Sequence, residues 1–253
     1  MAWLNLTPVS KHKSPETGLA FEFLQDLPTR RVMTGHDNGL ITLNVAEADS
    51  PEREKRRVAM GEAYRTLLGH FRDELGHYYW DRLIRDDQQW LDRFRALFGD
   101  DTEDYMQALQ RHYDGGPKAG WQQSFISSYA ASHAWEDWAE TWAHYLHIYD
   151  TLEMVTALNM PLGRLDTAVE HDLPPNEANY TDKPAGTQAA PAPASDFDDL
   201  LTRWLILCEA SNQINRCMGL PDLYPFVISA PAAEKLRYVH ELMEETRGRS
   251  GPH

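Results

Sequence analysis

The stretch Gly69-His-Phe-Arg-Asp-Glu-Leu-Gly-His-Tyr-Tyr-Trp80 decides how the fold of this chain is interpreted. Apolar residues recur at three- and four-residue steps before and through it, which predicts an amphipathic helix near 57–85. Side chains three or four residues apart share a helix face, so Asp73 and Glu74 lie with His77. Such a face either holds a metal ion or presents a solvated acidic pair beside a histidine at the core edge.

The spacing of these side chains is close to that of a zinc peptidase motif. In His-Glu-x-x-His, two imidazoles one turn apart bind the ion, and the Glu between them serves as base toward water. The string in this chain is Asp73-Glu-Leu-Gly-His77, so the base, Glu74, and the second ligand, His77, match. The first ligand does not match, because an aspartate stands where the motif has a histidine.

A second segment, Tyr129-Ala-Ala-Ser-His-Ala-Trp-Glu-Asp-Trp-Ala-Glu-Thr-Trp-Ala-His144, supplies further carboxylates. Glu136 and Glu140 are four residues apart, and like charges at this spacing repel on an isolated helix. Burial among the tryptophans of the segment would be costly unless a positive group lies opposite. That group is a divalent cation or an arginine; alternatively, the acidic side of an ordinary core helix faces water.

The remaining sequence predicts a mostly helical chain with a small sheet near its N-terminus. Residues 18–45 contain two short strands on either side of a turn-rich segment, and two strands need helices to pack on. Residues 51–160 form a helical core, with helices near 87–98, 101–113, 121–131 and 135–159, and two more helices lie within 197–247. The Pro- and Ala-rich stretch 173–196 is expected to be a flexible loop. We expect one mostly α (α+β) domain over 1–253.

Composition excludes several classes of partner. The 253 residues include 24 Lys and Arg against 39 Asp and Glu, which gives a net charge of −15. Such a surface repels phosphate backbones and anionic lipids, so we expect no nucleic acid and no membrane as partner. We find neither an apolar run of about 20 residues nor a secretory signal, and the two cysteines cannot form a disulfide framework. A cytoplasmic location is therefore expected.

Long strings of this sequence resemble the zinc-binding metallopeptidase family of bacteria, in which many members also carry a zinc ribbon. The strings that carry the resemblance are Gly35-His-Asp-Asn-Gly-Leu-Ile-Thr42, Tyr64-Arg-Thr-Leu-Leu-Gly-His-Phe-Arg72, Gly76-His-Tyr-Tyr-Trp-Asp81, Trp135-Glu-Asp-Trp-Ala-Glu-Thr-Trp-Ala-His-Tyr-Leu146 and Asn215-Arg-Cys-Met-Gly-Leu-Pro-Asp222. The resemblance covers nearly the whole chain and implies a zincin-like fold. The chain departs from the family at Asp73, and we expect the Cys-rich ribbon to be absent.

The resemblance also implies roles for the second segment. Zincins of the lethal-factor type use the first Glu of a Glu-x-x-Ala-Glu string as third ligand, with a Tyr seven residues earlier. Glu136-Asp-Trp-Ala-Glu140 and Tyr129 match that arrangement. Glu136 is then the third ligand, and Tyr129 donates its hydroxyl to the developing oxyanion or is a core tyrosine. Glu140 would hold the His77 ring, although the two glutamates can exchange roles.

Three alternatives remain open at the first ligand position. Asp73 binds the ion itself, which makes a formally neutral site with His77 and Glu136 and tilts the preference toward harder metals such as Mn²⁺. Alternatively His70 substitutes, but it lies about 10.5 Å along the helix from His77 and is better placed to support or pack beside the site. In the third alternative the metal is lost and the fold binds a protein partner. His144 is a further supporting candidate, one turn after Glu140.

The function implied by these residues and the resemblance is zinc-dependent hydrolysis of a peptide or protein substrate. Glu74 is the expected general base and Tyr129 an electrophilic helper. Zinc, or Mn or another divalent metal, is the expected cofactor. The alternative is a weakened or inactive zincin relative without metal, which acts as a protein-binding or scaffolding module.

Overall fold

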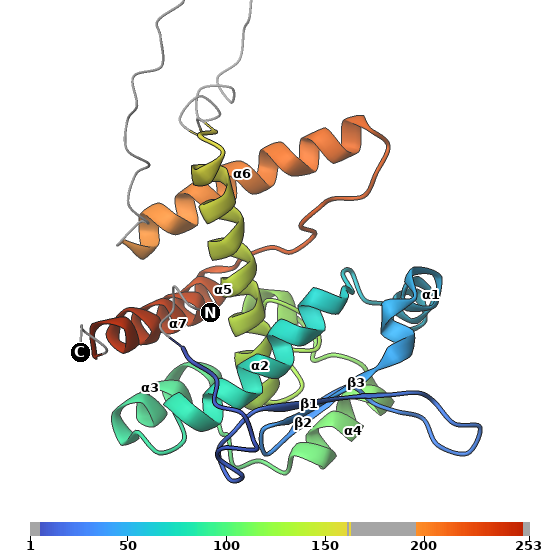
Figure 1. The fold of residues 1–253 in the computed structure, drawn as a ribbon. Coiled ribbons are helices and arrows are strands. Elements are labelled where there is room, and N and C mark those ends of the chain that lie inside the picture. The colour runs from blue at the N-terminus through green and yellow to red at the C-terminus, as the bar shows by residue number, and fades with distance from the viewer. Residues whose placement is uncertain (1–5, 161, 163–195, 250–253) are drawn as a thin grey trace, which may run out of the picture. The chain divides into compact units, whose positions relative to one another are not determined.

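The computed structural model of the chain describes residues 6–160, 162 and 196–249 (Figure 1). They fall into two compact units, one within residues 1–146 and 226–253 and one within 147–225. Helices predominate and a small sheet lies near the N-terminus, so the prediction of a mostly α (α+β) chain is confirmed. That the chain forms a single domain stays a prediction. The loop expected over 173–196 lies, apart from its last residue, outside the described residues.

The sheet has three strands in the order β1-β3-β2. Strand β1 (Ala20–Leu24) pairs in parallel with β3 (Leu40–Asn44), and β2 (Gly35–Asp37) pairs with β3 in the antiparallel direction. The sequence predicts only a turn where β2 lies. Both residues between β2 and β3, Asn38 and Gly39, have positive φ, as a tight two-residue hairpin requires. Strand β2 packs against α2 (Leu67–Leu83).

The other helices are α1 (Ser50–Met60), α3 (Gln88–Phe98), α4 (Tyr105–Gly115), α5 (Ala134–Ala157), α6 (Phe197–Cys217) and α7 (Ala230–Arg249). The single helix expected over 57–85 is wrong, because α1 ends at a left-handed Gly61 and α2 begins after the Thr66 cap. The helix expected over 121–131 is also wrong, because only a 3-10 turn forms at Trp121–Gln123. Further along this segment, Ser127 Oγ accepts the Ala130 N–H at 3.0 Å, and such a local side-chain bond competes with the backbone hydrogen bonds of a helix. No described helix has the length and apolar character needed to cross a membrane.

Helices α2 and α5 approach each other closely at Gly76. A Cβ atom on Gly76 would lie 3.0 Å from Ala139 Cα and 3.2 Å from the Trp142 side chain, so only glycine fits without a shift. The Trp138 indole donates to the Gly76 carbonyl oxygen at 2.8 Å, and Trp138 and Trp142 are both fully buried. This contact fixes the separation of the two helices and hence of the side chains that they direct toward each other.

Candidate metal centre

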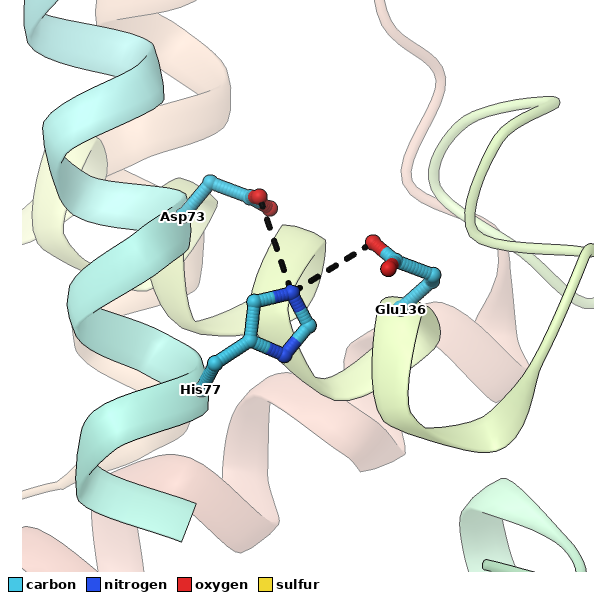
Figure 2. A group of neighbouring side chains, drawn as sticks. All are labelled: Asp73, His77 and Glu136. Atoms are coloured by element: carbon cyan, nitrogen blue, oxygen red, sulfur yellow. Dashed lines mark ion pairs between the residues drawn. The ribbon is translucent and has the colours of Figure 1, made fainter. Parts of the chain in front are cut away.

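Asp73, His77 and Glu136 meet between α2 and α5 (Figure 2). The Nε2 atom of His77 lies 3.9 Å from Asp73 Oδ2 and 3.5 Å from Glu136 Oε2. One ligand atom from each of the three residues lies within 4.8 Å of the other two. Zinc bonds to nitrogen and oxygen are about 2 Å long, so ligand atoms around one ion are separated by roughly 3 to 4 Å. The three side chains are thus close to the spacing of a shared ion.

Buried atoms without partners indicate that the donor set fits a cation. Asp73 Oδ1, Glu74 Oε2 and Glu136 Oε2 have no hydrogen-bond partner among the described residues. Only 1% of Glu136 and 4% of His77 are exposed to solvent. An unsatisfied buried carboxylate oxygen is costly, and a divalent cation would satisfy it. Two carboxylates and an imidazole suit zinc, and the oxygen-rich set also accepts harder metals.

The electrostatics of the cluster show an excess of negative charge. Burial raises the pKa of Asp73 well above its ordinary value, and the neighbouring Glu140 and Glu136 carboxylates add to this effect. Burial likewise raises the pKa of Glu74 to about 7. Burial opposes ionisation of Glu136 too, but His77 outweighs it and leaves the pKa of Glu136 lowered. Among the described residues, the imidazoles of His77 and His144 do not offset the burial of Asp73, Glu74 and Glu140, whose pKa values stay raised.

Aromatic rings enclose the His77 imidazole. The Trp135 ring centroid lies 4.0 Å from that of His77, and the His36 ring on β2 is stacked 6.3 Å away. The Gly39 N–H donates to His36 Nε2 at 2.9 Å, and burial lowers the pKa of His36 to about 4. The sequence places His36 in a turn. The structure shows that it lies on strand β2, which brings it beside the site.

Glu140 lies outside this group of three ligand candidates. Ser127 lies near its carboxylate, and its Oε2 lies 3.8 Å from His144 Nε2. Burial raises the pKa of Glu140 to about 7. His144 also packs edge-on against the Phe226 ring, with centroids 4.5 Å apart. The structure brings Glu136, rather than Glu140, next to Asp73 and His77.

His70 and Tyr129 have other neighbours. His70 Nε2 lies 3.5 Å from Glu47 Oε2, so the ring packs beside a different carboxylate from those near His77. The Tyr129 side chain lies near Tyr113, where burial raises the pKa of the Tyr113 hydroxyl and Tyr129 partly offsets this effect. Burial first and the nearby Glu136 charge second raise the pKa of Tyr129 well above its ordinary value. Tyr129 thus lies within electrostatic range of the site, and its role as an oxyanion donor stays a prediction.

Tyr105 is a site residue that the sequence does not reveal. It is the first residue of α4, and its hydroxyl donates to Glu136 Oε1. Its ring packs edge-on against His133 and Trp135, with centroids 5.4 and 5.6 Å away. Tyr105 and Glu136 are 31 residues apart in sequence, and no motif or periodicity links them.

His133 ties the start of α4 to the start of α5. Its Nδ1 accepts the Trp135 N–H at 3.0 Å, and its Nε2 lies 3.1 Å from the Glu103 carbonyl oxygen. Because Nδ1 acts as an acceptor, Nε2 carries the proton and donates it to Glu103. This imidazole therefore satisfies an N–H at the first turn of α5 and anchors the residues just before Tyr105.

Comparisons with known proteins agree with this geometry. The model of the family described as "Putative zinc-binding metallo-peptidase" matches residues 1–242. Curated relatives from Mycobacterium bovis and Mycobacterium tuberculosis, each named an uncharacterized protein, are 49% identical over 242 residues. The match covers 96% of this chain but only 65% of the length of these relatives. No solved structure matches the chain. By sequence, the chain belongs to this zinc-binding metallo-peptidase family.

Proposed function

We propose that this protein hydrolyses peptide bonds with the help of a divalent cation, with Asp73, His77 and Glu136 as its protein ligands. The observation that carries the proposal is the convergence of these three side chains from two helices in one buried cluster. Zinc is the proposed ion. The family to which the chain belongs supports both the metal and the class of reaction.

Glu74 is the proposed general base. It follows Asp73 on α2, is 6% exposed, and its Oε2 atom has no hydrogen-bond partner among the described residues. A bound divalent cation would supply Lewis acidity, which polarises a carbonyl group and acidifies water. The Glu74 carboxylate accepts the proton of the attacking water and passes it to the departing amine nitrogen. Tyr129 is proposed to donate its hydroxyl to the developing oxyanion.

Asp73 lowers the Lewis acidity expected of a bound divalent ion. Two carboxylates and one neutral imidazole leave a divalent ion formally neutral, whereas two imidazoles and one carboxylate leave it with one positive charge. A smaller residual charge acidifies water less, so we expect slow hydrolysis and greater tolerance of Mn²⁺. The same substitution favours the second candidate function, a family member that binds a protein partner without cleaving it.

The proposed substrate is an extended peptide or protein segment. Strand β2 forms one edge of the sheet, and its His36 ring lies beside His77. An extended segment can pair with such an edge through main-chain hydrogen bonds. These bonds keep the segment extended, and they form with most side-chain sequences. This placement would bring a peptide bond next to the three proposed ligands.

Metal content and peptide hydrolysis together test the proposal. The purified chain, incubated with zinc and dialysed, is expected to retain the metal and to cleave an unstructured protein slowly. Glu74→Gln should keep the metal and lose at least about 100-fold in rate, the usual contribution of a general base. Asp73→His should raise both metal affinity and rate. Retained metal with no cleavage by either the wild type or D73H would support the binding function instead.

A further inference from the structure

We infer that Tyr105 is a positioning residue that restricts Glu136 to a single oxygen toward the cation. The inference rests on the proposed metal site and adds a residue to it. Carboxylates bind cations through one oxygen or through both. A carboxylate binds through one oxygen when another group already holds its second oxygen.

The two oxygens of Glu136 have different surroundings. Oε1 accepts the hydrogen bond of the Tyr105 hydroxyl. Oε2 points toward the imidazole, 3.5 Å from His77 Nε2, and has no hydrogen-bond partner among the described residues. One oxygen is thus engaged by the protein, and the other is left for a ligand bond.

The position of the Tyr105 hydroxyl is itself fixed by its surroundings. Asp104 caps α4 by accepting the Gln107 N–H at 2.9 Å, so the helix begins at Tyr105. The Tyr105 ring packs on His133, which also holds the Glu103 carbonyl oxygen. The hydroxyl therefore approaches Glu136 from a defined direction, as expected of a group that orients a ligand.

This arrangement has a consequence for the coordination number of the ion. With one oxygen from Glu136, the three proposed ligands supply one atom each when Asp73 also binds through one oxygen. Catalytic zinc sites have three protein ligands and keep the fourth position for water or substrate. If both Glu136 oxygens turned to the ion, that open position would be filled. Tyr105 thus orients Glu136 and leaves the fourth coordination position free for water or substrate.

The test compares the wild-type chain with Tyr105→Phe, which removes only the hydroxyl. Tyr113→Phe is the matched control, because Tyr113 also lies on α4 but its neighbouring hydroxyl is that of Tyr129. Zinc affinity is measured by competition with a chelator, and the visible spectrum of the Co²⁺ form reports the coordination number. We expect Y105F to bind zinc about 10- to 100-fold more weakly. Its Co²⁺ absorption per bound ion should fall as the coordination number rises, and Y113F should match the wild type.

A double-mutant cycle with Glu136→Ala separates positioning from a loss of fold. A hydroxyl that acts through Glu136 has no further effect on zinc affinity in the E136A background, whereas general loosening of the fold would lower affinity there too. Equal losses in both backgrounds, or an unchanged affinity and spectrum in Y105F, overturn the inference and leave the metal site standing. A wild-type chain that binds no more metal than H77A overturns the proposed site itself, and the role of Tyr105 with it.

Discussion

Two glutamates of this protein are equally buried but have opposite surroundings. Glu47 and Glu136 each expose 1% of their surface. Arg65 donates two hydrogen bonds to Glu47, of 2.7 and 3.1 Å, and Arg56 and His70 each lie 3.5 Å from its carboxylate. Glu136 lies in a cluster with Asp73, Glu74 and Glu140, and the ion-pair partners described for these carboxylates are imidazoles.

The difference is visible in the pKa values. Burial opposes the charge of Glu47, but the nearby His70 ring and the hydrogen bonds of Arg65 outweigh it and lower its pKa to about 2. In the second cluster His77 lowers the pKa of Glu136 too, but burial raises the pKa values of its neighbours Glu74 and Glu140 to about 7. A buried carboxylate that only supports the fold is thus matched by cations of the chain itself. Among the described residues, the ion-pair partners described for the carboxylates around Glu136 are imidazoles, which fits the proposed cation.

The largest expected effect follows from removing the imidazole at the centre of the second cluster. His77→Ala should reduce zinc affinity by more than the roughly 10- to 100-fold that loss of an outer partner costs. His70→Ala is the matched control, because His70 lies beside Glu47 and should leave zinc affinity unchanged. Equilibrium dialysis with metal analysis measures both variants. Equal metal binding by H77A and H70A would contradict the assignment.

The next largest effect is expected at Glu47. Glu47→Gln removes the buried charge that Arg65 and Arg56 share and leaves them with their more exposed partners Glu62 and Asp26, which should cost about 2 to 3 kcal/mol of stability. Urea unfolding measures this change. Metal content should stay at the wild-type level once the protein is folded. If E47Q lost metal without losing stability, the division between a structural and a ligand cluster would be wrong.

A smaller effect is expected where the two ligand-bearing helices touch. In Gly76→Ala the new methyl group meets Ala139 and Trp142, so α2 must move away from α5 at a cost of about 1 to 3 kcal/mol. The shift separates His77 from Glu136, and zinc affinity should fall as well. Gly115→Ala, at the end of α4 with no atom near the added Cβ, is the control. Unchanged stability and affinity in G76A would show that the contact does not set the site.

The smallest effect concerns pH. The pKa of Glu47 is lowered from 4.5 to about 2 in the folded chain, so its stabilising contribution is complete above about pH 4.5 and is lost as pH falls toward 2. Between about pH 6 and pH 3.5, the wild type should lose roughly 1 kcal/mol more stability than E47Q. Urea titrations at both pH values measure this. Parallel losses would show that Glu47 is not held ionised by its partners.

Much of the fold could be predicted because its signals are local. Helical periodicity places Asp73, Glu74 and His77 on one face, and short apolar runs with β-branched and aromatic residues mark both longer strands. The apolar spacing does not predict the break between α1 and α2, because it continues past Gly61. The left-handed backbone at Gly61 nevertheless ends the helix. Local patterns are weakest at such boundaries.

The candidate site was only partly accessible from the sequence. Glu136 was singled out by a resemblance and by its spacing from Glu140, but its distance from His77 depends on the close crossing at Gly76. Tyr105 carries no sequence signal, and the sequence marks His36 only as a residue of a turn, because the two reach the site from a helix start and a short edge strand. Long-range contacts of this kind depend on tertiary packing, which no local periodicity encodes.

The central claim is that Asp73, His77 and Glu136 hold one divalent cation. An anomalous difference map, recorded at the zinc absorption edge from crystals grown with zinc, tests it most directly. The account predicts a single strong peak between α2 and α5, about 2 Å from His77 Nε2 and from one oxygen of Glu136. A map without a peak at this position, or with the peak bound by other residues, would contradict it.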